Sequence, residues 1–142
     1  MKKVITTLAI AVDLISCLAP CSLATNEYEF KECEIMEPRY EVIAHISASL
    51  NITSSGRANC GAAVTLLPGY KVDLTAELQQ KDGGRWETIR DWEASGSNRV
   101  SVSGPWYVMP GYSYRLRVTA TVYDANGNFI ESPVEYSPIR DY

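Results

Sequence analysis

Hydrophobic and polar residues alternate along most of the chain after residue 40. Every second residue is apolar in four segments, which span residues 41–53, 58–66, 72–78 and 112–122. Side chains of a β-strand point alternately to the two faces of a sheet, so a period of two indicates a strand with one buried face. We therefore expect a regular, half-buried strand in each of these segments.

Three further segments carry weaker strand patterns. Residues 86–92 are expected to form an edge strand in which Trp86 supplies a core ring, although Ile89 breaks the alternation. Residues 100–102 are expected to form a short strand that ends at Gly104 and Pro105. Residues 129–136 are expected to form the seventh strand. Clusters of Gly, Pro, Asn, Asp and Ser separate the segments, as expected of turns. The pattern predicts an all-β fold, an antiparallel seven-stranded sandwich of immunoglobulin-like or fibronectin-like topology, over residues 41–142.

The first 24 residues have the pattern of a cleaved signal peptide. Lys2 and Lys3 precede an apolar run that ends at the small-residue site Ser22-Leu23-Ala24. The run is about 15 residues long, short of the roughly 20 that a bilayer requires, so we expect export and no membrane span. The mature chain is predicted to begin at Thr25 and to be secreted or associated with the envelope of a bacterial cell.

Lipidation is the alternative interpretation of the same segment. Residues 14–17 resemble a bacterial lipobox, which would place a lipid on Cys17. Asp13, directly before these residues, does not suit that pattern. Simple secretion is therefore the favoured prediction.

Export leaves two of the four cysteines in the mature chain. Cleavage after Ala24 removes Cys17 and Cys21 and leaves Cys33 and Cys60, and two thiols in an exported protein most simply form one disulfide. Because Cys33 precedes the first strand, this bond is expected to tie an N-terminal segment, residues 25–40, to the sandwich. The two cysteines have neither the spacing nor the additional ligands of a redox pair or a zinc site.

Length and charge limit the classes of function. The chain has 142 residues, 46% of them hydrophobic and 21% charged, and a formal net charge of -4. The length and composition fit one globular domain. The negative net charge argues against the clustered basic surface that nucleic-acid binding requires. We expect no nucleic-acid partner.

Residues 108–120 resemble the corner and following strand of fibronectin type III domains. The shared features are Pro110-Gly111-Tyr112-Ser113-Tyr114 and the apolar alternation that follows. The resemblance implies that the Tyr114 ring packs in the core and that its hydroxyl bonds to the backbone of the corner. The second strand lacks the Trp that such domains carry. The chain also resembles uncharacterised short exported proteins of Gram-positive bacteria in its Cys60-Gly61 step and its Gly111-to-Arg115 core, which implies no activity.

The sequence offers few groups for catalysis. The single histidine, His45, has the polar parity of its strand and is expected to face solvent. Residues 87, 91 and 93 are acidic and are expected to share one face of the fourth strand, a pattern typical of a solvated edge. No catalytic residue, metal site or cofactor is predicted, and the chain is expected not to be an enzyme.

Two other polar groups have simple structural interpretations. Asp124, Asn126 and Asn128 faintly resemble a calcium loop, but Gly127 stands where a hairpin turn needs it. Arg115 and Arg117 are expected to lie near Asp73 or Glu77 if the third and sixth predicted strands pair.

Aromatic residues are the strongest indication of binding. The chain holds 3 Trp and 9 Tyr, and the candidate ligand-binding residues are Trp86, Trp92 and Trp106. The sequence therefore predicts an exported module that acts through its surface, in adhesion, in the envelope or on an unknown protein partner. The alternative is a small carbohydrate-binding module whose exposed rings stack on a glycan partner.

Overall fold

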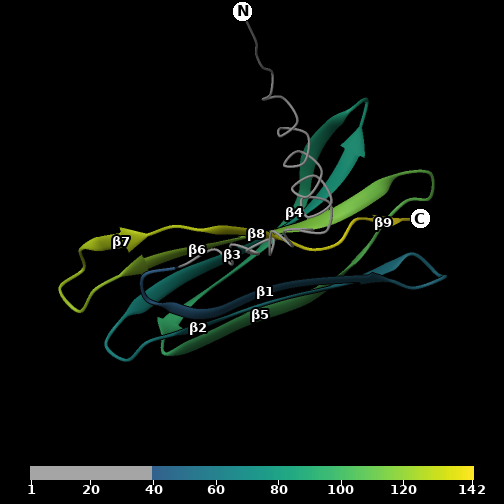
Figure 1. The fold of residues 1–142 in the computed structure, drawn as a ribbon. Coiled ribbons are helices and arrows are strands. Elements are labelled where there is room, and N and C mark those ends of the chain that lie inside the picture. The colour runs from purple at the N-terminus through teal and green to yellow at the C-terminus, as the bar shows by residue number, and fades with distance from the viewer. Residues whose placement is uncertain (1–39) are drawn as a thin grey trace, which may run out of the picture. The chain divides into compact units, whose positions relative to one another are not determined.

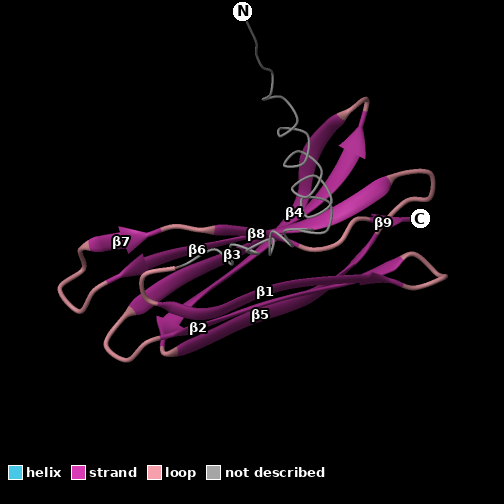
Figure 2. Ribbon diagram, in the orientation of Figure 1, coloured by secondary structure: helices cyan, strands magenta, loops and turns pink. Residues whose placement is uncertain are grey.

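The computed structural model describes residues 40–142, which form nine strands in two antiparallel sheets (Figures 1 and 2). The predicted signal peptide, Cys17, Cys33 and all of the N-terminal segment except Tyr40 lie outside these residues. The strands are β1 (Ile43–Ile52), β2 (Arg57–Leu66), β3 (Lys71–Asp82), β4 (Arg85–Ser97), β5 (Arg99–Tyr107), β6 (Ser113–Tyr123), β7 (Phe129–Glu131), β8 (Val134–Tyr136) and β9 (Arg140–Asp141).

The strands divide into the two layers seen in Figure 1. One sheet has the order β1-β2-β5, and the other has the order β4-β3-β6-β7, with β8 and β9 also paired to β6. Each regular alternation in the sequence became a strand, and β3 pairs with β6 as expected. Residues 40–142 contain no helix long and apolar enough to cross a membrane.

The apolar faces of both sheets form one hydrophobic cluster. Leu74, Leu78 and Leu116 from the six-stranded sheet are fully buried, as is Val64 from the three-stranded sheet. Burial of apolar surface stabilises a fold by about 25 cal/mol per Å², and alternation lets each strand bury one face while the other contacts water. His45 is exposed on the outer side, as predicted.

A bulge at Ile89 divides β4 into two parts with opposite side-chain orientation. Arg90 lies opposite Leu78 on β3, whereas Thr88 lies opposite the next residue, Gln79, so that Ile89 is the extra residue. One extra residue reverses which face each later side chain occupies. The expectation that Trp86 is a core ring was therefore wrong: Trp86 lies on the outer face with Lys81.

The same bulge separates the acidic residues of β4. Asp91 and Glu93 pair with outward-facing residues of β3, whereas Glu87 pairs with Gln80, which shares the inner face with Tyr114. The prediction that the three carboxylates share one face was wrong. Glu87 is nevertheless exposed, because the hairpin of β3 and β4 projects away from the two layers (Figure 1).

Proline acts differently in two strands. The fifth strand was expected to end at Gly104 and Pro105, but β5 continues through both to Tyr107. Because β5 is an edge strand paired only with β2, the missing amide of Pro105 costs no hydrogen bond of the sheet. The predicted single strand over residues 129–136 is instead interrupted at Pro133, and β9 follows after Pro138, which raises the number of strands from seven to nine.

The corner before β6 is held by Tyr114. Its side chain is fully buried, and its hydroxyl donates a 2.5 Å hydrogen bond to the carbonyl oxygen of Met109. Burial raises the pKa of Tyr114 above its ordinary value. Gly111 has a φ of 95°, a left-handed conformation that suits glycine, and follows Pro110 in this turn.

Candidate functional site

The three tryptophans lie in two separate stacks, each built around an arginine. On the outer face of the six-stranded sheet, the guanidinium of Arg115 lies 4.2 Å from the ring centre of Trp86 and 4.4 Å from that of Tyr136. These rings come from β4 and β8, on either side of the paired strands β3 and β6. We call Trp86, Arg115 and Tyr136 the outer stack.

Two residues of β3 contact the outer stack. The Nε of Arg115 donates a 2.8 Å hydrogen bond to Oε1 of Gln79, which is only 6% exposed. The Nζ of Lys81 lies 5.8 Å from the ring centre of Trp86. The guanidinium is thus held by its two ring contacts and by a bond in its own plane.

The neighbouring arginine makes the ion pair predicted from the sequence. Arg117 Nη1 lies 3.5 Å from Glu77 Oε2, and Glu77 also accepts a hydrogen bond from the hydroxyl of Thr88. The other expected acidic partner, Asp73, accepts a hydrogen bond from Ser95 instead. Exposed pairs such as that of Arg117 contribute only about 0 to 1 kcal/mol.

The second stack lies where the edge strands β4 and β5 meet. The Arg90 guanidinium is 5.0 Å from the ring centre of Trp106 and 5.8 Å from that of Trp92. Trp92 packs against the core and lies over Gly104, where a Cβ atom would overlap its indole nitrogen. Glycine is therefore required at position 104 by the ring that covers it.

Three large exposed side chains lie at and just after the end of β5, next to the second stack. Trp106 is 39% exposed, Tyr107 71% and Met109 68%. Large exposed side chains within four consecutive positions are unusual, since scattered single residues are the rule on a protein surface. We call these three residues the β5 rim.

Cys60 lies in the interior, opposite Gly104 of β5. Burial raises the pKa of its thiol to about 12, so a free thiol at this position is protonated at neutral pH. No other cysteine lies among residues 40–142, and Cys33 is outside them, so the disulfide stays a prediction. A bond to Cys60 requires that Cys33 reach a side chain that points between the sheets.

The described residues offer little to a metal ion. No group of three or more His, Cys, Asp and Glu side chains within residues 40–142 is arranged to hold one. The carboxylate of Asp124 accepts hydrogen bonds from the amides of Asn126 and Asn128, at 2.8 and 2.9 Å. These bonds, that to Asn128 above all, hold the pKa of Asp124 below its ordinary value. Its oxygens therefore serve the hairpin turn.

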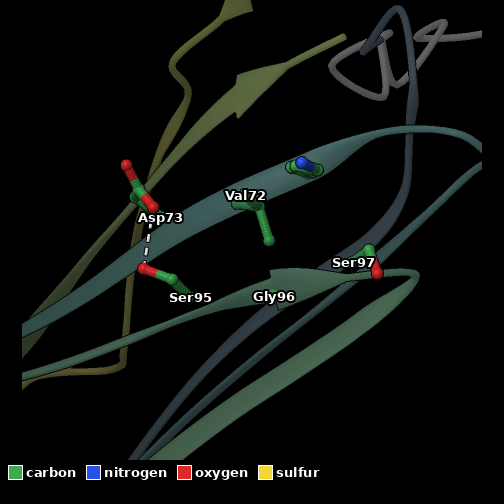
Figure 3. A pocket seen from close by; sticks show the side chains of 6 residues that line it. Val72, Asp73, Ser95, Gly96 and Ser97 are labelled. Carbon is green, nitrogen blue, oxygen red and sulfur yellow. Dashed lines mark hydrogen bonds between the residues drawn. The ribbon is translucent and has the colours of Figure 1, made fainter. Parts of the chain in front are cut away.

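A small hollow lies between the start of β3 and the end of β4. Its volume is about 200 Å³, and its lining includes Val72, Gly96 and the hydrogen-bonded pair of Asp73 and Ser95 (Figure 3). Pockets that enclose a small ligand usually measure about 300 to 1,000 Å³. The hollow is smaller than this and open to solvent, so the outer stack and the β5 rim are the stronger candidates for recognition.

Sequence reasoning identified the tryptophans but missed their partners. Arg90 and Arg115 lie against the tryptophan rings, Tyr136 lies against Arg115, and Tyr107 and Met109 are exposed near Trp106. The alternation around Arg115 predicted that its side chain points outward. The bulge at Ile89 was not expected, so the sequence did not predict that the Trp86 ring shares this face. No protein-family model matches the chain, and no curated protein matches it.

Proposed function

We propose that this chain is an exported, non-enzymatic binding module that contacts a protein partner through the β5 rim. Two features support it, which are the signal peptide predicted for residues 1–24 and the exposed side chains at the end of β5. The roles that we propose for it are adhesion and attachment to the cell envelope.

The framework proposed is a sandwich of the fibronectin type III kind. Two antiparallel sheets with the orders β1-β2-β5 and β4-β3-β6-β7 support it, as does the inward packing of both sheets on one core. The bond between the Tyr114 hydroxyl and the Met109 carbonyl supports the resemblance of this corner to those domains. A sandwich of this kind hosts many unrelated functions, so the function is argued from the surface.

The β5 rim is the observation that carries the proposed function. Trp, Tyr, Met and Arg are enriched at protein interfaces, and Trp, Tyr and Arg are the commonest residues at their energetic centres. The rim combines Trp106, Tyr107 and Met109, and Arg90 lies against Trp106. Three large side chains are thus exposed at the end of β5, with Trp106 and Arg90 on the inner side of the strand and Tyr107 on the outer side.

The test is a binding comparison between three forms of the full chain. Wild type, a Tyr107→Ser/Met109→Ser double variant and a Phe129→Ser control are immobilised and exposed to secreted and envelope proteins of the source cell. Phe129 is 61% exposed and belongs to another strand, β7, so it controls for the loss of an exposed ring. We expect one identified protein to bind wild type and the control and to be lost from the double variant.

Equal capture by all three forms contradicts the proposal. A hydrolase activity of the chain that a single carboxylate substitution abolishes also contradicts it, since the proposal assigns no chemistry to these residues.

Glycan binding through Trp106 is the second candidate function. The observation in its favour is the partial exposure of this ring, at 39%. The cations are against it, because Arg90 lies against Trp106, and Lys81 and Arg115 against Trp86. If Trp106→Ala removes binding to a glycan in a broad panel while the fold persists, this second function replaces the first.

A further inference from the structure

We propose that the outer stack is a binding site for carboxylate groups, and that its ligand is an acidic side chain of an extended peptide. The site lies on the outer face of the six-stranded sheet and is separate from the β5 rim. Its existence does not depend on the function proposed for the rim.

The guanidinium of Arg115 is fixed before any ligand arrives. Trp86 and Tyr136 lie against it at 4.2 and 4.4 Å, and the bond from Nε to Gln79 sets its rotation within that gap. An arginine side chain normally loses considerable freedom when it binds, and that loss weakens binding. Here the packing of the folded chain has already ordered the side chain.

Arg115 also lacks an acidic partner within the described residues. No carboxylate of residues 40–142 lies within 4.0 Å of its guanidinium, and the ion pair nearby is made by Arg117 and Glu77. Nε is used by Gln79, and neither Nη has a hydrogen-bond partner in residues 40–142. The two Nη groups are the donors that arginine offers to a carboxylate in bidentate pairs.

The contacts explain why carboxylate is the favoured ligand. With aromatic rings against it, the guanidinium meets a ligand at the edge that carries the Nη donors. A planar carboxylate matches this edge, since its two oxygens accept two parallel hydrogen bonds. The ring contacts further fix the plane in which those bonds form.

A peptide fits the surroundings better than an acidic sugar does. A sugar ring would stack on an aromatic face, but Trp86 has Arg115 and Lys81 against it, which leaves only the exposed ring of Tyr136 for stacking. An extended peptide needs no free ring face, because alternate side chains on one side of it are about 7 Å apart and reach a flat sheet surface directly. Tyr136, 44% exposed, leaves an apolar surface beside the cation.

The experiment is an NMR titration of the full exported chain with two capped hexapeptides, acetyl-(Glu-Ala)₃-amide and acetyl-(Gln-Ala)₃-amide. The Arg115 Nε–Hε and Trp86 indole N–H signals report on the stack. We expect the glutamate peptide to shift both signals to saturation and to bind at least about tenfold more tightly than the glutamine peptide, as expected for loss of a charge-assisted bond.

Variants locate the binding. Arg115→Gln is expected to weaken the glutamate peptide about tenfold, whereas Arg99→Gln, which removes an exposed cation of β5 on the other sheet, leaves it unchanged. Arg115→Lys keeps the charge but loses the planar pair of donors, and is expected to weaken binding as well.

Three results overturn the proposal. The first is equal binding of the glutamate and glutamine peptides to wild type, which requires no variant to fold. The second is unchanged binding in a folded Arg115→Gln variant. The third is a shift of the Arg115 signal by an oligouronate but not by the glutamate peptide, which would make the ligand an acidic glycan. Loss of partner binding at the β5 rim leaves all three readings unaffected, so the two proposals fail independently.

Discussion

The outer faces of the two sheets differ sharply, although the same alternating pattern encodes both. On the six-stranded sheet, neighbouring strands are joined by the outer stack, by the ion pair of Arg117 and Glu77, and by the hydrogen bond between Ser95 and Asp73. The three-stranded sheet presents small, uncharged side chains over most of its outer face. Its paired rows are Ser47-Ala63-Ser101, Ser49-Gly61-Ser103 and Asn51-Asn59-Pro105.

Side-chain length accounts for the difference. Long side chains on one sheet reach across two or three strands, whereas a serine reaches no farther than the adjacent strand, as the 3.1 Å bond from the Ser49 hydroxyl of β1 to the Gly61 carbonyl of β2 shows. Cross-strand pairs contribute roughly 0.2 to 1 kcal/mol each, and the small face has few. Long and aromatic side chains are therefore concentrated on the six-stranded sheet and at the β5 rim, where the small face ends in Tyr107.

The largest effect is expected inside the three-stranded sheet. Gly104→Ala places a Cβ atom in the Trp92 ring, which must move. We expect the free energy of unfolding to fall by about 1 to 3 kcal/mol, as for other overpacked cores, measured by chemical denaturation.

Gly61→Ala is the matched control on the outer side of the same sheet. The added Cβ meets only the Ser49 hydroxyl oxygen, at 2.8 Å, which rotates away. The expected change is within about 0.5 kcal/mol. If Gly61→Ala is as destabilising as Gly104→Ala, the small face is tightly packed and the comparison between the faces fails.

A smaller effect separates the two sides of the six-stranded sheet. Tyr114→Phe removes the hydroxyl that bonds to Met109 in a buried corner and should lower the free energy of unfolding by about 1 to 2 kcal/mol. Tyr136→Phe keeps the ring of the outer stack and should change the free energy of unfolding by less than about 0.5 kcal/mol. Equal melting temperatures of Tyr114→Phe and wild type would show that the corner bond is not stabilising.

The alternation of the sequence predicted the regular strands because each rests on many residues that agree. In β6, five successive inward positions from Tyr114 to Val122 are apolar, and the structure buries all five. In the fourth strand the sequence showed only that Ile89 breaks the alternation, and a single irregular residue does not say that the side chains before and after it exchange faces. The consequence of the bulge at Ile89 was large: it moved Trp86 from the expected core to the outer face.

The candidate site was predictable only in part, since it depends on which strands are neighbours. The sequence indicated Arg115 as outward-facing and the tryptophans as candidates, but Trp86 is 29 positions from Arg115 and Tyr136 is 21 positions beyond it. Only the order of β4, β3, β6 and β8 brings them together. Proline gives a second example. A proline in a central strand would end that strand, but Pro105 is tolerated because β5 is an edge strand, and the sequence alone does not say which strand is the edge.

The most direct test of the central claim, that the module works through the β5 rim, is site-specific photocrosslinking in the cell that makes it. A benzophenone amino acid replaces either Tyr107 or Ser101, which lie on the same face of β5, one at the rim and one within the small face. We predict a covalent adduct with a single partner protein from position 107 and none from position 101. An adduct from position 101 with none from position 107 would contradict the account.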